Sequence, residues 1–230
     1  MDLEPKQNIR LCVDAVVFGY TAKESISVLL IKRTIPPFMH RWALPGGFVI
    51  DGETLEEAVT RELQTEAGVH INYLEQLYTF GQPERDPRGR IISVAYFGLV
   101  NPTNFKLAAS SDAEDANWFD IKKLPDLAFD HSAIVEAAVK RLRAKIRYEP
   151  IGFELLDQKF PISDLEKLYE TVLDRPIDRR NFQKKINHLG ILMGHNEKQK
   201  HPSAGRPAKL YSFNEERYFQ LKKEGITFEI

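Results

Sequence analysis

Apolar and polar positions alternate along the first half of the chain in a pattern that predicts several strands. Residues 9–19 and 27–33 are rich in β-branched side chains and are separated by a polar turn, which is typical of adjacent strands. Further strands are predicted over 71–80, over 91–100 and in a short segment that ends at Trp118-Phe119. This half of the chain is therefore expected to form a sheet.

Two segments of the same region have a helical period instead. Thr54 is a predicted N-cap, Glu57 completes a capping box with it, and Gly68 ends the helix. The apolar face of this helix consists of Leu55, Ala58, Val59 and Leu63. A second amphipathic helix is predicted over 131–146. Strands interleaved with helices indicate an α/β protein, a mixed α/β sandwich, over residues 1–150.

The remainder, residues 151–230, is predicted to be a second domain. Residues 147–161 contain two prolines and no clear period, which indicates a loose linker and the entry to that domain. A helix is predicted over 163–173 with Ser163 as its cap, and another over 179–189 between Asp178 and Gly190.

The chain after these helices predicts a wing. Apolar residues 191–193 and the segment 208–213 flank a polar loop of about a dozen residues. In the second helix, Phe182, Ile186 and Leu189 form the inward stripe. Helix, turn, helix and two wing strands together predict an α+β winged helix-turn-helix domain.

The charge of the chain is unevenly distributed. The total is −1, but residues 179–209 contain eight basic residues and one acidic residue, so this segment carries +7 and the remainder −8. A basic helix with an adjoining basic loop is typical of nucleic-acid binding. A solvated basic face is the alternative, and the helix-turn-helix-wing order favours DNA. The predicted DNA-contacting residues are Arg179, Arg180, Asn181, Gln183, Lys184, Lys185, Arg206 and Lys209. Arg206 lies in a turn that could enter a minor groove.

The composition of the chain also bears on the cellular compartment of the protein. Cys12 is the only cysteine among the 230 residues, which excludes an intrachain disulfide and favours a cytoplasmic setting. The first ten residues lack an apolar signal core, and no apolar run approaches membrane-spanning length. The sequence therefore predicts a cytoplasmic protein with no membrane partner.

Two acidic residues lie at unexpected positions of the first helix. Glu62 and Glu66 are four residues apart and project beside its apolar face. A buried carboxylate must be paired or must bind a metal, and hard oxygen ligands suit Mg²⁺ or Mn²⁺. An amphipathic helix with a ragged polar edge is the alternative.

These carboxylates belong to a motif with defined spacing. Gly47 is followed by five residues and then Glu53, and seven residues further comes the segment 61–69, RELQTEAGV. The spacing resembles a Nudix box at all but one of its defining positions, Thr65, where the family usually carries a glutamate. The resemblance covers about residues 8–147 and implies the Nudix fold there.

A narrower resemblance extends over nearly the whole chain. A Nudix domain followed by RRNFQKKINHLGIL and GRPAKLYSF is similar to the Nudix-related transcriptional regulators. The segments LPGGF at 44–48, RDPRG at 85–89 and LAFDH at 127–131 fit these proteins and the related ADP-ribose pyrophosphatases. The resemblance implies a DNA-binding regulator that binds a pseudo-palindromic operator as a homodimer. Its Nudix domain would sense ADP-ribose or a related pentose or sugar phosphate.

Two other functions remain open. One is a magnesium-dependent hydrolase of the ADP-ribose pyrophosphatase type, whose winged helix serves dimerisation or another partner. Its activity is expected to be weak because Thr65 is neutral and replaces a box glutamate. The other is an interaction protein with both sites inactive, which the retained Glu62 and Glu66 argue against.

The resemblance also implies roles for individual residues. The catalytic residues would be Glu62, Glu66, Arg61 and Glu53. Of these, Glu62 and Glu66 would bind the metal, Arg61 would orient carboxylates and Glu53 would anchor the loop. Gly46, Gly47, Arg85 and Arg88 would bind the effector, although a charged hairpin turn also explains the two arginines. A further acid from a later loop could be Glu84, Asp86, Glu114 or Asp115, among which the sequence does not choose. The role of His131 stays open, and His188, His195 and His201 lack zinc-site spacing.

Overall fold

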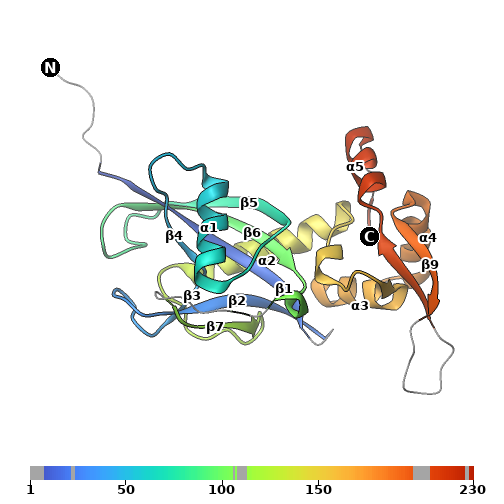
Figure 1. Ribbon diagram of the computed structural model, residues 1–230, viewed down its shortest axis with the longest axis horizontal. Coiled ribbons are helices and arrows are strands. Elements are labelled where there is room, and N and C mark those ends of the chain that lie inside the picture. Colours follow the sequence, from blue (N-terminus) through green and yellow to red (C-terminus); the bar gives the residue numbers. More distant parts are fainter. Residues whose placement is uncertain (1–7, 22–23, 106, 108–112, 199–207, 226–227) are drawn as a thin grey trace.

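The computed structural model describes residues 8–21, 24–105, 107, 113–198, 208–225 and 228–230. Within these ranges, no helix is both long enough and apolar enough to cross a bilayer. The described chain forms a sheet-based part and a smaller helical part, which lie side by side (Figure 1).

The first part is built on a mixed sheet. Its central strands are β1 (Arg10–Thr21) and β6 (Ile91–Val100), which run parallel with Cys12 opposite Ser93. The strand order is β3-β2-β1-β6-β5, while β4 pairs with β1 and β7 with β2, and each of these pairs except β1–β6 is antiparallel. The other strands are β2 (Ser25–Arg33), β3 (Trp42–Ala43), β4 (Gly46–Phe48), β5 (Tyr73–Phe80) and β7 (Ala113–Asp120).

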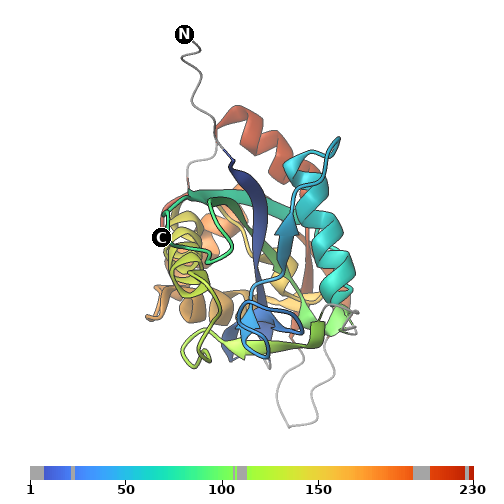
Figure 2. The same ribbon diagram turned by 90° about the vertical axis from the view of Figure 1, so that its left-hand side faces the viewer.

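One helix covers each face of this sheet. Figure 2 shows the strands between α1 (Leu55–Ala67) and α2 (His131–Tyr148). The apolar core on the α1 side includes Val13 and Leu63, and the core on the α2 side includes Phe97 and Leu142. The predicted α/β sandwich is therefore confirmed, and the short strands β3 and β4 are additions that the sequence pattern did not reveal.

The ends of α1 have the predicted chemistry. The N–H of Glu57 donates to Thr54 Oγ1 at 3.2 Å, and the N–H of Thr54 donates to Glu57 Oε2 at 2.7 Å. This is the predicted capping box. Gly68 ends the helix with φ +67°, a left-handed conformation that suits glycine.

The second part has winged-helix topology. It contains α3 (Ile162–Leu173), α4 (Arg179–Leu189) and the wing strands β9 (Leu192–Lys198) and β10 (Lys209–Phe213). A two-residue strand, β8 (Phe160–Pro161), pairs with the other edge of β10. Two 3-10 turns, η1 (Pro102–Asn104) and η2 (Phe153–Leu155), precede these elements.

Two details of this part differ from the sequence prediction. Ser163 is an exposed residue inside α3 and not its cap, because the helix already begins at Ile162 after Pro161. A further helix, α5 (Glu215–Glu224), follows the wing and was not predicted. The cap of α4 is as predicted, since the N–H of Asn181 donates to Asp178 Oδ1 at 3.1 Å.

The two parts share one apolar cluster, which includes Phe97 and Leu142 of the first part and Phe182 and Ile186 of the second, so the predicted looseness of the linker is wrong. Phe153 is 6% exposed, and its ring stacks on that of Phe213 with 4.0 Å between centroids. The Tyr169 hydroxyl donates to the carbonyl of Ile151 at 3.2 Å. Residues 151–156 lack periodicity because they pack individually between the two parts, and not because they are solvated.

Candidate functional site

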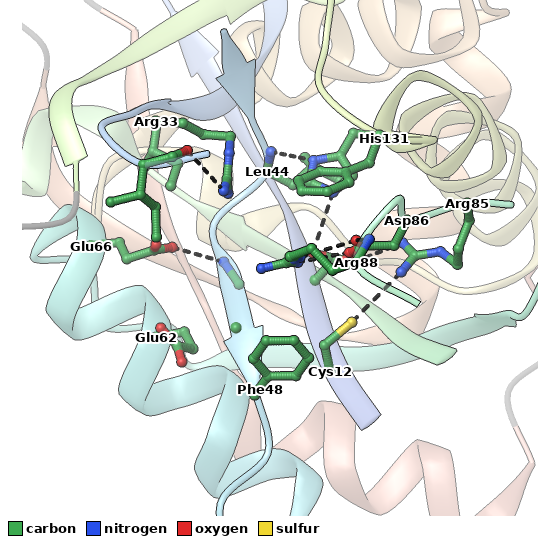
Figure 3. Close-up of a pocket in the computed structure, with 16 residues that line it drawn as sticks. Cys12, Arg33, Leu44, Phe48, Glu62, Glu66, Arg85, Asp86, Arg88 and His131 are labelled. Carbon is green, nitrogen blue, oxygen red and sulfur yellow. Dashed lines mark hydrogen bonds and ion pairs between the residues drawn. The ribbon is translucent and has the colours of Figure 1, made fainter. Parts of the chain in front are cut away.

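A pocket of about 240 Å³ opens where α1, β1, the loop at 85–88 and the start of α2 meet. Figure 3 shows Glu62 and Glu66 along one side of it and Arg85, Asp86 and Arg88 on the opposite side. The predicted Gly46 and Gly47 also line it. The fold thus gathers predicted residues from separate sequence segments around one cavity.

The box glutamates contact the glycine loop directly. Glu66 is buried, and its Oε2 accepts a hydrogen bond from the N–H of Gly46 at 2.8 Å. At Gly47, a Cβ atom would lie 2.1 Å from Glu62 Oε1, so any side chain there would push the Glu62 carboxylate out of its place. At Gly46, a Cβ would lie 2.2 Å from the carbonyl oxygen of Val13. The backbone path of β4 beside β1 therefore requires glycine at position 46, and glycine at position 47 leaves room for the Glu62 carboxylate.

Arg61 and Glu53 lie behind these glutamates. The Arg61 guanidinium donates to Glu53 at 2.7 and 3.0 Å, to the Phe48 carbonyl at 3.1 Å and to Glu62 Oε1 at 2.6 Å. Glu53 also accepts from the N–H of Ile50 at 2.7 Å. The Arg61 hydrogen bonds lower the pKa of Glu53. Neither residue lines the pocket, so this pair braces the loop between β4 and α1.

The surroundings of Glu66 disfavour the negative charge of its carboxylate. Burial raises the pKa of its carboxyl to about 8, and the nearby charges of Glu62 and Asp14 act in the same direction. A divalent cation would reverse this effect by stabilising the ionised form. Within the described ranges, however, no three His, Cys, Asp or Glu side chains are grouped as metal ligands. Thr65 is exposed and does not line the pocket.

The floor of the pocket is a buried polar network centred on Arg85. Its side chain is 2% exposed and donates to Asp130 at 2.7 and 2.9 Å and to Asp14 at 3.3 Å. Asp14 also accepts from Ser93 Oγ at 2.5 Å. These contacts hold the guanidinium at the base of the cavity, where two carboxylates neutralise its charge.

His131 joins this network to the loop that precedes Gly46. Its Nδ1 accepts the N–H of Leu44 at 2.8 Å, which requires a neutral ring with its proton on Nε2. Nε2 lies 3.5 Å from Asp14 Oδ1. Complete burial lowers the pKa of His131, in agreement with the neutral form. The role left open for His131 is thus filled by a contact that positions the loop.

Arg88 lies at the rim, where it is accessible. Its side chain is 34% exposed and pairs with Asp86 at 2.7 Å. Of the later-loop acids with described side chains, Asp86 lines the pocket, while Glu84 and Asp115 are exposed elsewhere. The side chain of Glu114 lies outside the described residues. Between Arg88 and Arg85, Arg88 is therefore the one that an entering anion can reach.

Aromatic rings complete the pocket. Arg88 lies 5.1 Å from the Phe48 ring centre and 5.4 Å from that of Phe129, and Arg33 lies 4.9 Å from Phe129. Guanidinium groups bind phosphate, and aromatic faces stack on flat rings. The combination suits a nucleotide-like ligand. Sequence reasoning missed Asp14, Arg33 and Phe129, although an aspartate within an otherwise apolar strand was a visible signal for Asp14.

The predicted DNA-contacting residues lie on α4 and the wing. Arg180, Asn181 and Lys184 are exposed on α4, and Lys209 is exposed on β10. Gln183 and Lys185 contact other parts of the chain, and Arg179 does so too although its side chain remains exposed. Arg206 lies outside the described residues.

Comparison with known proteins agrees with this architecture. Residues 9–150 match the model of the NUDIX domain, and residues 152–213 match that of the NrtR DNA-binding winged helix domain. The ADPR responsive transcriptional repressor NtrR of Acinetobacter baylyi is 32% identical over 208 residues, which are 88% of this chain and 81% of that protein. The chain therefore belongs to the Nudix family, and within it to the NrtR-type proteins that join a Nudix domain to a winged helix.

Solved structures show the same arrangement. Shewanella oneidensis NrtR is 33% identical with a TM-score of 0.80, covering 90% of this chain and 95% of its own. The structure of the same protein complexed with a 27mer DNA has a TM-score of 0.78 and 31% identity, and the match covers 91% of this chain and 95% of that chain. The structure of its NUDIX domain complexed with ADP ribose has a TM-score of 0.55 and 35% identity, and the match covers 61% of this chain and 94% of that chain. An ADP-ribose pyrophosphatase of Methanocaldococcus jannaschii is 41% identical over 57% of this chain and 76% of that protein.

Proposed function

We propose that this chain is a DNA-binding transcriptional repressor whose Nudix domain senses ADP-ribose, with a phosphorylated pentose as the second choice of effector. Residues 1–150 form the effector-binding domain and residues 151–230 the DNA-binding domain. The observation that carries the proposal is the presence, in one chain, of a Nudix pocket with arginine and aromatic walls and an exposed basic helix.

The relatives support both halves of this proposal. The Shewanella oneidensis protein is complexed with DNA in one structure, and its NUDIX domain with ADP ribose in another. In this chain, Arg88 would contact the phosphates of the effector, while Arg85 holds the pocket floor from below. The Phe48 and Phe129 rings pack against the Arg88 guanidinium, so together they would form an aromatic wall beside the bound effector.

A metal ion is part of the proposed site. Nudix domains generally use divalent ions, and we assign Mg²⁺ or Mn²⁺ to Glu62 and Glu66. Each carboxylate has one oxygen engaged by the protein, by Arg61 or by Gly46, and one oxygen left for an ion. Because Mg²⁺ usually keeps several waters, two carboxylates suffice for one ion. When bound, the ion would neutralise phosphate charge.

The repressor is proposed to act in the cytoplasm as a homodimer on a pseudo-palindromic operator. A two-fold dimer would present two copies of α4 to half-sites about one helical turn apart. ADP-ribose can release DNA only if it binds the DNA-free state more tightly.

The experiment uses the full chain throughout. A duplex is first selected from random sequences. The affinity of the protein for this duplex is then measured in the presence of ADP-ribose, ribose 5-phosphate or AMP. AMP is the control, because it lacks the second phosphate and the second ribose of ADP-ribose. We expect a two-fold-related motif and a loss of affinity with ADP-ribose of about tenfold. Absence of any enriched motif contradicts the repressor function. A motif whose affinity no compound changes contradicts the sensor function alone.

A second candidate function is hydrolysis of ADP-ribose. It is favoured by the retained Glu62 and Glu66 and by the likeness to an ADP-ribose pyrophosphatase. In that reaction, a water oxygen would bond to one phosphorus atom while the bridging P–O bond breaks, which gives two phosphate monoesters. Glu62 and Glu66 would hold the divalent ion that supplies stabilisation of the developing charge. With Thr65 in the box, we expect slow or absent turnover. Turnover at about 1 per second or faster in Mg²⁺ or Mn²⁺ would establish an enzyme instead.

A further inference from the structure

The helix α4 has three distinct faces. Phe182, Ile186 and Leu189 are buried in the core. Arg180, Lys184 and Asn187, spaced four and then three residues apart, are exposed along the opposite face. Asn181 is exposed beside them. None of these four side chains has a hydrogen bond or an ion pair within the described part of the protein, so the whole face is available to a partner.

The flank of α4 that faces α3 is occupied by carboxylates. Gln183 Nε2 donates to Glu166 Oε1 at 2.6 Å, and Glu166 is only 5% exposed. Arg179 pairs with Glu170 at 3.3 Å and approaches Glu166 at 4.0 Å. Glu170 is itself fixed, because its Oε1 also accepts from the N–H of Ile177 at 3.5 Å.

Releasing these contacts would be unfavourable on binding DNA. If Gln183 turned towards a base, the buried Glu166 carboxylate would lose its 2.6 Å donor. If Arg179 turned towards a phosphate, Glu170 and Glu166 would face the nucleic acid with less compensation for their negative charge. A third side chain, Lys185, is held on the other flank, where it donates to the carbonyl of Glu229.

We propose that α4 reads DNA with Arg180, Asn181, Lys184 and Asn187, and that Glu166 and Glu170 of α3 hold Gln183 and Arg179 out of that surface. This rests on the proposed DNA-binding function and specifies which residues perform it. It removes Arg179, Gln183 and Lys185 from the contacts predicted by charge and adds Asn187, which the charge pattern ignored.

The chemistry assigns different tasks to the members of this surface. An asparagine amide can pair with both N6 and N7 of adenine, so Asn181 and Asn187 are suited to read bases. Arg180 and Lys184 can bind phosphates or the acceptor edge of guanine. Glu166 and Glu170 are positioning residues, since they act through Gln183 and Arg179.

Two matched pairs of variants in the full chain test the proposal, using the duplex selected by the natural protein. Asn187→Ala should lower the preference for one base pair in each half-site about tenfold, whereas Gln183→Ala should leave every base preference in place. Arg180→Gln should reduce the slope of log affinity against log salt by about one, whereas Arg179→Gln should change that slope much less. Melting temperatures verify that each variant is folded.

A variant of α3 provides an independent measurement. Glu170→Gln removes the nearer of the two carboxylates that face Arg179, so affinity for an unrelated duplex should rise about threefold with a steeper salt dependence. The proposal is overturned if Gln183→Ala relaxes a base position or if Arg179→Gln lowers the salt slope as much as Arg180→Gln. Natural protein that selects no duplex overturns the proposed function itself, which separates the two failures.

Discussion

The N–H of Gly46 donates to Glu66 Oε2 at 2.8 Å, and this bond joins the glycine loop to the last turn of α1. Because Glu66 is buried beside Glu62 and Asp14, its pKa is raised to about 8. The same carboxylate is therefore a structural partner of the loop and, in the proposed metal site, a group whose ionised form a divalent cation would stabilise.

The first prediction concerns pH. A carboxyl whose pKa is higher in the folded than in the unfolded protein stabilises the fold below its ordinary pKa of 4.5, and this stability is lost as the pH rises towards 8. In EDTA the loss should be on the order of 4 kcal/mol for this group. We expect the melting temperature to fall between pH 5 and 8, and Glu66→Gln to remove much of that fall. The exposed Glu216→Gln serves as control, and an identical pH profile for Glu66→Gln would contradict the assignment.

The second prediction concerns the glycine loop. Gly47→Ala places a Cβ against Glu62 and must displace it, so stabilisation by Mn²⁺ and by ADP-ribose in thermal-shift measurements should be largely lost. Gly81→Ala is the matched control, because its Cβ would meet no atom closer than 3.9 Å. Equal ligand responses in the two variants would show that the Glu62 position is unimportant for binding.

A third prediction concerns the basic helix. Reversing Arg180 and Lys184 to glutamate should abolish binding to the selected duplex, since phosphate contacts dominate affinity. The control reverses Lys123 and Lys223, both exposed, and changes the net charge by the same amount. Anisotropy titrations over a range of salt concentrations compare the two. Similar losses in both proteins would mean that only total charge matters. The thermal response to ADP-ribose should persist in both.

The fourth prediction concerns Thr65. Thr65→Glu adds a carboxylate one turn from Glu62 and should raise ADP-ribose hydrolysis above that of the natural protein. Gln64→Glu adds the same charge at the preceding position, which is also exposed, and should not raise ADP-ribose hydrolysis. Phosphate release with coupled phosphatase, at matched Mg²⁺ and Mn²⁺, measures both. If Thr65→Glu is as inactive as the natural chain, the missing ligand lies outside α1.

Local patterns predicted the elements well because each is encoded by neighbouring residues. The capping box of Thr54 and Glu57 and the left-handed Gly68 could be predicted because their partners lie within a few positions. The start of α3 was misplaced because Pro161, and not the better cap Ser163, precedes its first turn.

Long-range pairing was beyond such patterns. Arg85 was predicted to bind phosphate, but it is 71 residues from Asp14 and 45 from Asp130 in the chain, and only the fold brings these charges together. The same holds for Gln183 and Glu166, which belong to different helices. Residue type indicates what a side chain can bind, whereas burial and neighbours decide what remains available.

The apolar cluster that continues from Phe97 and Leu142 of the Nudix part into Phe182 and Ile186 of the winged helix has a consequence for signalling. Swinging the winged helix away from the Nudix sheet would expose the apolar cluster between them, at about 2.5 kcal/mol for each 100 Å². Such a hinge motion within one subunit is therefore disfavoured, and the chain should melt in a single cooperative transition. In a dimer, an effector would then act by rotating whole subunits, which changes the distance between the two copies of α4 while each chain keeps its shape.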